Sequence, residues 1–215
     1  MNEIKIDEPV KKDYNKETKV LIGIMIIVIV VILLAQWLVQ KSKKFEYGGF
    51  SFYKEKEGDI TFYKSLLGYV TASGENIPFI LKLRNDPRVL DEIQFEGVLK
   101  LKNETILSVS PNIANCSDTY ITMIDFARTL KAFGISAKAA TTDVNYSKEY
   151  NATLADCRNS LGRTVVVMKE GNETKISQEK LVFKDCYVIE IKDCKIGQSF
   201  ERFLLELIKS SNSGI

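Results

Sequence analysis

The feature that most constrains this chain is a stretch of twenty-one uncharged residues near its start, from Val20 to Gln40. It reads VLIGIMIIVIVVILLAQWLVQ and is bounded by Lys19 and Lys41. A helix of this length spans roughly 30 Å, the thickness of the hydrocarbon core of a bilayer. Isoleucine and valine favour strands in water, but a lone segment in lipid must satisfy its own backbone and is therefore helical. The stretch predicts a helix that spans the lipid bilayer through residues 20–40.

Two other structures fit such a stretch. A buried core helix needs a fold that wraps it on every side, whereas the rest of the chain is long enough to form a domain by itself. A cleaved signal peptide has a shorter apolar region and small residues at its cleavage site, which residues 36–41 lack. Trp37 lies where an aromatic residue at the headgroup level is expected. These points favour an uncleaved, single-pass signal-anchor.

Lysine content does not orient this span, because five lysines precede it and five lie in the twenty residues that follow it. Acceptor sequences for N-glycosylation do orient it. Five Asn-x-Ser/Thr sequences follow the span, more than the roughly one or two expected by chance, and they are modified only outside the cytosol. One begins at Asn115, and we expect glycans on the other four, at Asn103, Asn145, Asn151 and Asn172.

The four cysteines also follow the span, and an even number in an exposed domain indicates two disulfides. Cys186 and Cys194 flank a predicted strand, so roughly 26 Å of extended chain separates them, whereas a disulfide needs Cα atoms roughly 5.5 Å apart. Two pairings remain. We prefer Cys116–Cys194 with Cys157–Cys186, because Cys116 and Cys194 each follow a strand and precede a helix. Four buried free thiols are the alternative.

Together the acceptor sequences and cysteines predict a cell-membrane protein with a cytoplasmic N-terminus and an extracytoplasmic C-terminal domain. The predicted parts are a short cytoplasmic tail at 1–19, the transmembrane helix at 20–40, the extracytoplasmic domain at 45–209 and a flexible tail at 210–215.

The domain itself has two regions. Residues 45–101 contain short aromatic or β-branched runs separated by turn residues, at 45–52, 60–63, 69–71, 78–83 and 93–101, which is typical of strands. Residues 102–209 alternate strands with helices. There a strand at 105–110, a helix that Ser117 or Asp118 caps and a strand at 135–141 form a βαβ unit. The fold class is therefore α/β with a mixed sheet, in two or three layers.

Several local features of this second region are specific enough to test. The helix after Asp118 carries apolar residues that we expect on one face: Ile121, Ile124, Phe126, Ala127, Leu130 and Phe133. Residues 164–168 form a buried strand, and a turn at Gly171 predicts an antiparallel partner at 174–177. A strand at 187–191 precedes a last helix that Ser199 caps, with an apolar face of Phe200, Phe203, Leu204, Leu207 and Ile208.

Composition argues against several functional classes. The chain has no histidine, which excludes a Ser-His-Asp centre and any His-ligated metal site. It has no glycine-rich phosphate loop, and its net charge of +2 gives no reason to expect nucleic acid as a partner. Cys116 precedes a helix and is a conceivable nucleophile, but without a histidine base a structural role is favoured. We expect no metal and no cofactor.

Polar residues nevertheless gather after the predicted strands. Open α/β sheets bind ligands at the carboxyl ends of their strands. That edge predicts a binding crevice of Ser110, Asn112, Asp118, Thr119, Asp193 and Lys195, and the alternative is that these residues cap helices and line loops. The charged turn at 84–88 is interpreted as a solvated loop, with an anion site as the alternative.

Five segments together resemble a group of archaeal single-pass membrane-anchored proteins with an extracytoplasmic α/β domain and no assigned function: Leu83–Arg88, Cys116–Tyr120, Gly171–Thr174, Cys186–Glu190 and Glu201–Leu205. The resemblance implies an archaeal cell surface and an N-glycosylated exterior, and it adds no catalytic residue.

The sequence therefore predicts a non-enzymatic binding or scaffolding module whose partner is another envelope or membrane protein. One alternative is a surface hydrolase that acts on glycans or peptides through carboxylates or a Ser/Thr nucleophile. The other is an inverted topology with a cytoplasmic domain that binds a nucleotide-like ligand.

Overall fold

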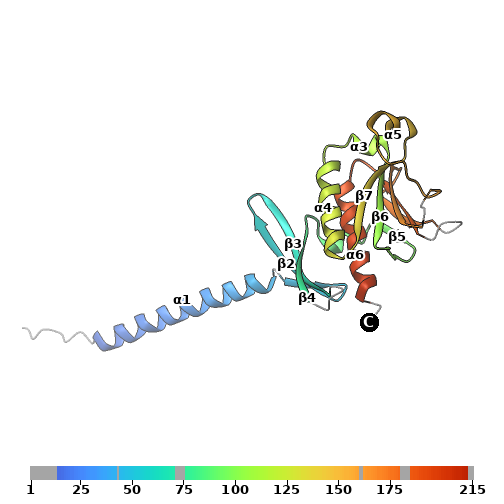
Figure 1. Cartoon of the computed structure of the whole chain (residues 1–215). Helices are drawn as coiled ribbons and strands as arrows, with labels where there is room; N and C mark the ends of the chain where they lie inside the picture. Colours follow the sequence, from blue (N-terminus) through green and yellow to red (C-terminus); the bar gives the residue numbers. More distant parts are fainter. Residues whose placement is uncertain (1–13, 43, 71–75, 160–161, 180–184, 213–215) are drawn as a thin grey trace, which may run out of the picture. The chain divides into compact units, whose positions relative to one another are not determined.

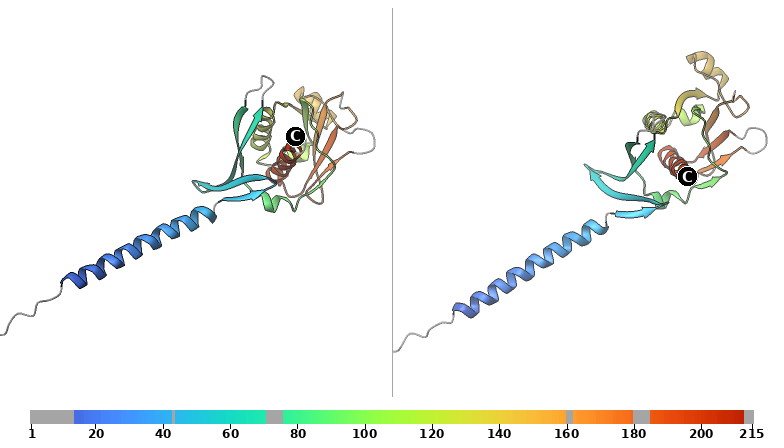
Figure 2. Two further views of the ribbon diagram at one scale, coloured as in Figure 1. Left: turned by 90° about the horizontal axis from the view of Figure 1, so that it is seen from below. Right: turned by 60° about the horizontal axis from the view of Figure 1, so that its bottom comes forward.

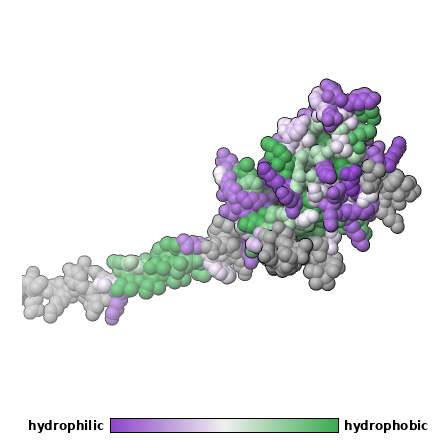
Figure 3. Space-filling model, viewed as in Figure 1, coloured by the Kyte–Doolittle hydropathy of each residue, from purple (hydrophilic) through white to green (hydrophobic). Residues whose placement is uncertain are grey.

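The computed structural model describes residues 14–42, 44–70, 76–159, 162–179 and 185–212. Packing divides the chain into two units, residues 1–44 and 45–215. In the first unit, helix α1 (Tyr14–Ser42) contains a 20-residue stretch, Thr18–Trp37, that is long and apolar enough to cross a membrane. None of this stretch is buried against protein, and its visible surface is hydrophobic (Figure 3). One such helix fits a membrane anchor or a signal sequence.

The second unit begins with a four-stranded antiparallel sheet in the order β1-β2-β3-β4. Its strands are β1 (Lys44–Tyr47), β2 (Phe50–Glu57), β3 (Ile60–Val70) and β4 (Asn76–Leu83). The runs predicted at 60–63 and 69–71 therefore belong to one long strand as far as Val70, because the residues between them continue the pairing with β4, while residue 71 lies outside the described residues.

A second sheet has six strands in the order β5-β9-β10-β8-β6-β7. All neighbours are parallel except β9 and β10, which are antiparallel. The strands are β5 (Gln94–Glu96), β6 (Glu104–Val109), β7 (Ser136–Thr141), β8 (Thr164–Glu170), β9 (Lys175–Gln178) and β10 (Cys186–Ile191).

Two helices, α4 (Thr119–Ala132) and α6 (Ile196–Asn212), lie between the sheets (Figures 1 and 2). The remaining helices are short: α2 (Pro87–Leu90), α3 (Pro111–Ala114) and α5 (Val144–Tyr150). The arrangement is thus sheet, helices, sheet, which confirms the mixed α/β class.

One main core joins the three layers. Phe52 and Leu81 from the first sheet, Phe126 and Phe203 from the helices, and Met168 from the second sheet are all at most 2% exposed. Side chains alternate between the two faces of a strand, so the neighbouring β8 residues face a second, smaller core on the far side of the second sheet. That smaller core is Ile106, Ala140, Ala155, Val165, Val167 and Cys186.

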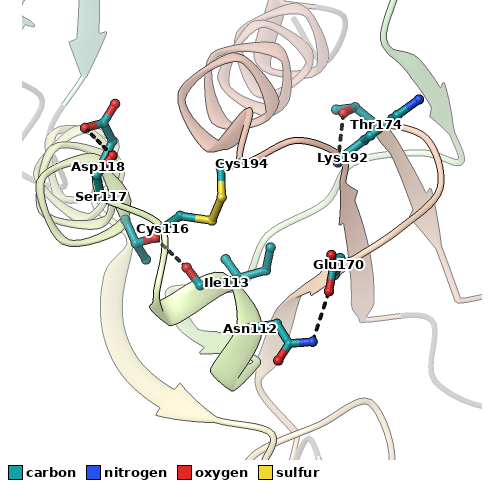
Figure 4. Close-up of a disulfide and its surroundings, with 10 residues drawn as sticks. Asn112, Ile113, Cys116, Ser117, Asp118, Glu170, Thr174, Lys192 and Cys194 are labelled. Carbon is teal, nitrogen blue, oxygen red and sulfur yellow. Dashed lines mark hydrogen bonds between the residues drawn. A yellow bond between two sulfur atoms is a disulfide. The ribbon is translucent and has the colours of Figure 1, made fainter.

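Both predicted disulfides are present. Cys116 and Cys194 are bonded with Cα atoms 5.8 Å apart, and Cys157 and Cys186 with Cα atoms 5.4 Å apart. The first bond joins the loop before α4 to the loop before α6 (Figure 4). The second fastens the loop after α5 to the first residue of β10.

Three local predictions about strands and helices are wrong. Of the run predicted as a strand at 93–101, only β5 at Gln94–Glu96 is a strand. Residues 175–178 do not pair with β8, because β10 lies between them and is parallel to β8 and antiparallel to β9. Ser199 does not cap α6, which begins at Ile196. Its buried hydroxyl instead donates to the carbonyl of Lys195 within the first turn.

The predicted apolar face of α4 is only partly buried. Phe126 and Leu130 are in the core, but Ile121 is 57% exposed and Ile124 is 51% exposed. The segment after β7 contains α5, a helix that the sequence does not predict. Asp143 caps its first turn by accepting from the backbone N–H of Tyr146 at 2.7 Å.

Candidate functional site

A groove of about 660 Å³ lies between β4, α4 and the start of α6. Both views in Figure 2 show α4 next to β4, with α6 on the other side of α4, toward the second sheet. Its volume falls within the range typical of ligand sites. Four aromatic rings line it, those of Phe62, Phe79, Phe126 and Phe200, of which the last two also belong to the core.

One wall is the edge of β4. Phe79 and Leu81 belong to the core face of the strand, whereas Ile80 is 49% exposed on the other face. Phe79, Ile80, Lys82 and Arg84 all line the groove. Because residues of both faces contribute, the groove opens along the edge of the strand and not over one face of the sheet.

The facing wall is one side of α4. Asp118, Thr122, Asp125 and Thr129 recur at intervals of three and four residues, so they form a stripe along about three turns of the helix. Asp125 also pairs with Arg128 at 3.7 Å, and both side chains are more than half exposed.

Glu201 of α6 closes the groove on the third side. Its carboxylate accepts hydrogen bonds from the backbone N–H groups of Arg84 at 2.5 Å and Asn85 at 3.0 Å, and from the Asn85 side-chain amide at 2.7 Å. Burial raises the pKa of the Glu201 carboxyl above its ordinary value, and these N–H donors oppose the rise. Glu201 therefore holds the turn after β4 in place.

The charged turn at 84–88 is occupied by its own contacts. Asp86 accepts from the Arg88 guanidinium at 2.6 Å, and this pairing lowers the pKa of the Asp86 carboxyl. The guanidinium also lies 4.2 Å from the centre of the Phe45 ring, as in a cation–π contact. The solvated-loop interpretation thus accounts for Asp86 and Arg88 better than an anion site.

Positive charge prevails among the exposed groups of the groove. Lys82, Arg84, Arg128 and Lys195 line it, against the exposed carboxylates of Asp118 and Asp125.

Cys194 lines the groove next to Lys195, and its half of the disulfide is exposed. Asp193 and Cys194 have φ values of 53° and 54°, in the left-handed region. The bond to Cys116 is thus one constraint that holds this strained turn beside the groove.

The six residues of the predicted crevice do not lie in one hollow. Asp118 and Lys195 line the groove. Asp193 lies in the exposed turn that precedes Lys195. Asn112 donates to Glu170, the last residue of β8, at 3.0 Å (Figure 4). Thr119 is buried and donates to the Ile113 carbonyl at 2.6 Å.

Ser110 is the remaining member of that set. Its backbone N–H donates to the carbonyl of Met168 at 2.9 Å, which ties the end of β6 to β8. Its buried hydroxyl has no hydrogen-bond partner within the described part of the chain. Ser110 occupies the N-cap position of α3, but its side chain makes no capping hydrogen bond.

Thr119 lines a second, mostly apolar cavity of about 440 Å³ at the carboxyl ends of β6 and β7. Tyr120 and Tyr146 also line it, and a hydrogen bond between their hydroxyls raises the pKa of Tyr146. The Tyr146 and Tyr150 rings lie 4.4 Å apart. The sequence does not predict this cavity, because it does not predict α5.

All four asparagines expected to carry glycans are exposed: Asn103, Asn145, Asn151 and Asn172. Asn151 ends α5 with φ 49°, a left-handed conformation that asparagine tolerates. The positions are therefore accessible, and glycosylation itself stays a prediction.

The groove contains groups that can bind a ligand. Backbone groups at a strand edge, aromatic rings and exposed cations provide hydrogen bonds, apolar contacts and charge. Among the described residues, no group of three or more His, Cys, Asp or Glu side chains is placed to hold a metal ion.

Comparison with known proteins gives no relative: no family model, no curated protein and no solved structure matches the chain. The resemblance to archaeal anchored proteins thus stays a prediction, and function must be argued from the groove.

Proposed function

We propose that this protein is a single-pass membrane protein whose second unit lies outside the cytoplasm and binds another envelope component in the β4–α4 groove. The groove is the observation that carries the binding role, because it offers an open strand edge, aromatic rings and excess positive charge together.

The extracytoplasmic location rests on the disulfides and the helix. Both disulfides lie in the second unit, and such bonds persist in oxidising compartments. Helix α1 is apolar and unburied over the length of a bilayer core, as an uncleaved anchor requires. The exposed acceptor asparagines agree with the same orientation.

The location is tested by adding a protease to intact cells that express the full chain. We expect loss of the domain with retention of a membrane-embedded α1 fragment, and glycan mass on Asn103, Asn145, Asn151 or Asn172. A protected, unmodified domain would support the inverted, cytoplasmic topology instead.

The binding role is tested by photo-crosslinking in the same cells. A benzoylphenylalanine at Thr122, inside the groove, should form a discrete adduct, whereas the same group at Lys131, exposed on the same helix outside the groove, should not. Equal adducts from both positions would contradict a groove-specific partner. Cleavage of the captured molecule by the purified chain would favour the alternative, a surface hydrolase that uses carboxylates such as Asp118 and Asp125.

A further inference from the structure

The edge of β4 is the most open strand edge in the described sheets. β1 and β5 are also edge strands but have only 4 and 3 residues. β7 is partly covered, because Thr141 forms a bridge with Leu154. β4 has 8 residues. None of its residues after Pro78 is a proline, so each has a backbone N–H for pairing.

Exposed edges of this kind normally carry a device that blocks a further strand. Pro78 blocks only the beginning of β4, and Lys82 is the single charge between Phe79 and Leu83. In the described sheet β4 has β3 as its only strand neighbour, so backbone N–H and C=O groups of alternate residues point to the groove side.

The two walls match in length. The lining residues of β4 and of the turn that follows it run from Phe79 to Arg84, which is about 17 Å at 3.4 Å per residue. Those of α4 run from Asp118 to Thr129, which is about 16 Å at 1.5 Å per residue. A channel of this length holds about five residues of extended peptide.

The ends of the channel differ. Near Phe79 it is apolar, since that ring packs edge-to-face on Phe133 at 5.8 Å. Near Arg84 it is polar and carries Lys195, Gln198 and the Glu201 carboxylate. Arg128 lies along the α4 wall, 77% exposed at its side chain.

We propose that the groove takes an extended peptide segment of a partner protein, which adds as a fifth strand to the edge of β4. Strand addition draws affinity from main-chain hydrogen bonds and specificity from alternate side chains. The apolar side chains of the segment pack on Phe62, Phe79 and Ile80, and its acidic side chains face Arg84, Arg128 and Lys195. The proposal rests on the proposed function, because it names the partner class of that same groove.

The ligand is sought with a phage library of random twelve-residue peptides, selected on the full chain in lipid nanodiscs. Counter-selection uses the Arg128→Glu variant, and Lys131→Glu is the matched control outside the groove. We expect enriched peptides in which apolar and acidic residues alternate. No enrichment over the Arg128→Glu variant, or enrichment of basic peptides, would overturn the proposal.

The most enriched peptide is then labelled with fluorescein and measured by anisotropy. Arg128→Glu should weaken binding about tenfold and Lys131→Glu less than twofold. Two N-methylated versions, modified at odd or at even amides, separate strand addition from side-chain binding. One series should lose at least tenfold and the other should bind unchanged, because only alternate amides face β4. Equal behaviour of the two series contradicts a strand.

These outcomes are distinct from failure of the proposed function. A groove that crosslinks in cells to a non-peptide molecule leaves the binding role intact and refutes the strand. A cytoplasmic domain refutes the proposed location, whereas the anisotropy result still decides the strand. Dimerisation of the full chain that Arg128→Glu abolishes, without peptide binding, would show that a second copy occupies the groove and would overturn the proposal.

Discussion

Glu201 and Asn85 are joined by two hydrogen bonds across 116 positions of sequence, one to the backbone N–H and one to the side-chain amide of Asn85. Helix α6 thereby holds the turn that ends β4, and with it one end of the groove. Glu201 is buried, and both hydrogen bonds end on its carboxyl group, so the stability they contribute depends on the protonation of Glu201.

Replacement of Glu201 by Gln tests this dependence. The pKa of Glu201 is raised from 4.5 in the folded chain by burial, so the stability it contributes is fully present below pH 4.5 and is lost as pH rises through the folded pKa. The difference in unfolding free energy between the native chain and Glu201→Gln should therefore fall as pH increases from 4 to 8. Urea unfolding in micelles, followed by near-ultraviolet circular dichroism, measures it. A constant difference would contradict the assignment.

The two disulfides should differ in their contributions to stability. Their closed loops span sequence separations of 29 and 78, for which chain entropy gives about 3.6 and about 4.5 kcal/mol. Replacement of each pair by serines, measured by the same urea unfolding, should show the larger loss for Cys116–Cys194. The smaller loop lies within the larger, so the losses from the two single replacements should not add up to the loss from removing both. A loss below about 1 kcal/mol for either pair would be inconsistent with this estimate.

Tyr187 should be sensitive to the loss of one oxygen atom. Its buried hydroxyl accepts from the Lys100 N–H at 2.8 Å and donates to the Val98 carbonyl at 2.9 Å. Tyr187→Phe leaves that N–H unpaired and should cost about 1–3 kcal/mol. Hydrogen exchange at Lys100 should accelerate accordingly. Tyr150→Phe, at a 60% exposed site, is the control and should change stability by less than about 0.5 kcal/mol.

A charge in the middle of α1 should impair membrane insertion. Ile29 lies near the centre of the Thr18–Trp37 stretch, where arginine costs about 2.5–3.5 kcal/mol. Ile29→Arg should increase the fraction of protein extracted by alkaline carbonate. Thr18→Arg, at the boundary of the stretch, should leave that fraction unchanged. Equal extraction of the two variants would argue against a span centred on these residues.

The sequence predicts features that local pattern and covalent reach determine. The buried strand at 164–168 and the apolar face of α6 follow from residue type. The distance that a strand imposes between Cys186 and Cys194 excludes their pairing, and the places of Cys116 and Cys194 after strands favour the pairing that is present. The strand and the helix face depend on residues that are close in the sequence, and the disulfides depend on how far apart an extended segment holds two cysteines.

Features that depend on distant segments are not predicted. β10 lies between β8 and β9 because it pairs in parallel with β8, whose residues are more than twenty positions earlier in the sequence. No turn sequence indicates such a pairing. Ile121 and Ile124 match a helical period but face outward, because α4 meets α6 and the second sheet only through its other side. The groove combines β4 with α4 and α6, so Glu201 and Arg128 gave no local signal at all.

The position of α6 has a consequence for biogenesis. Phe200, Phe203 and Leu204 fill the space between two sheets whose strands all precede them in the sequence. Neither sheet can bury its inner face until those residues arrive. The segment from β1 to β10 therefore leaves the ribosome without a completed core, and the four cysteines of the chain stay accessible until α6 arrives and completes the domain.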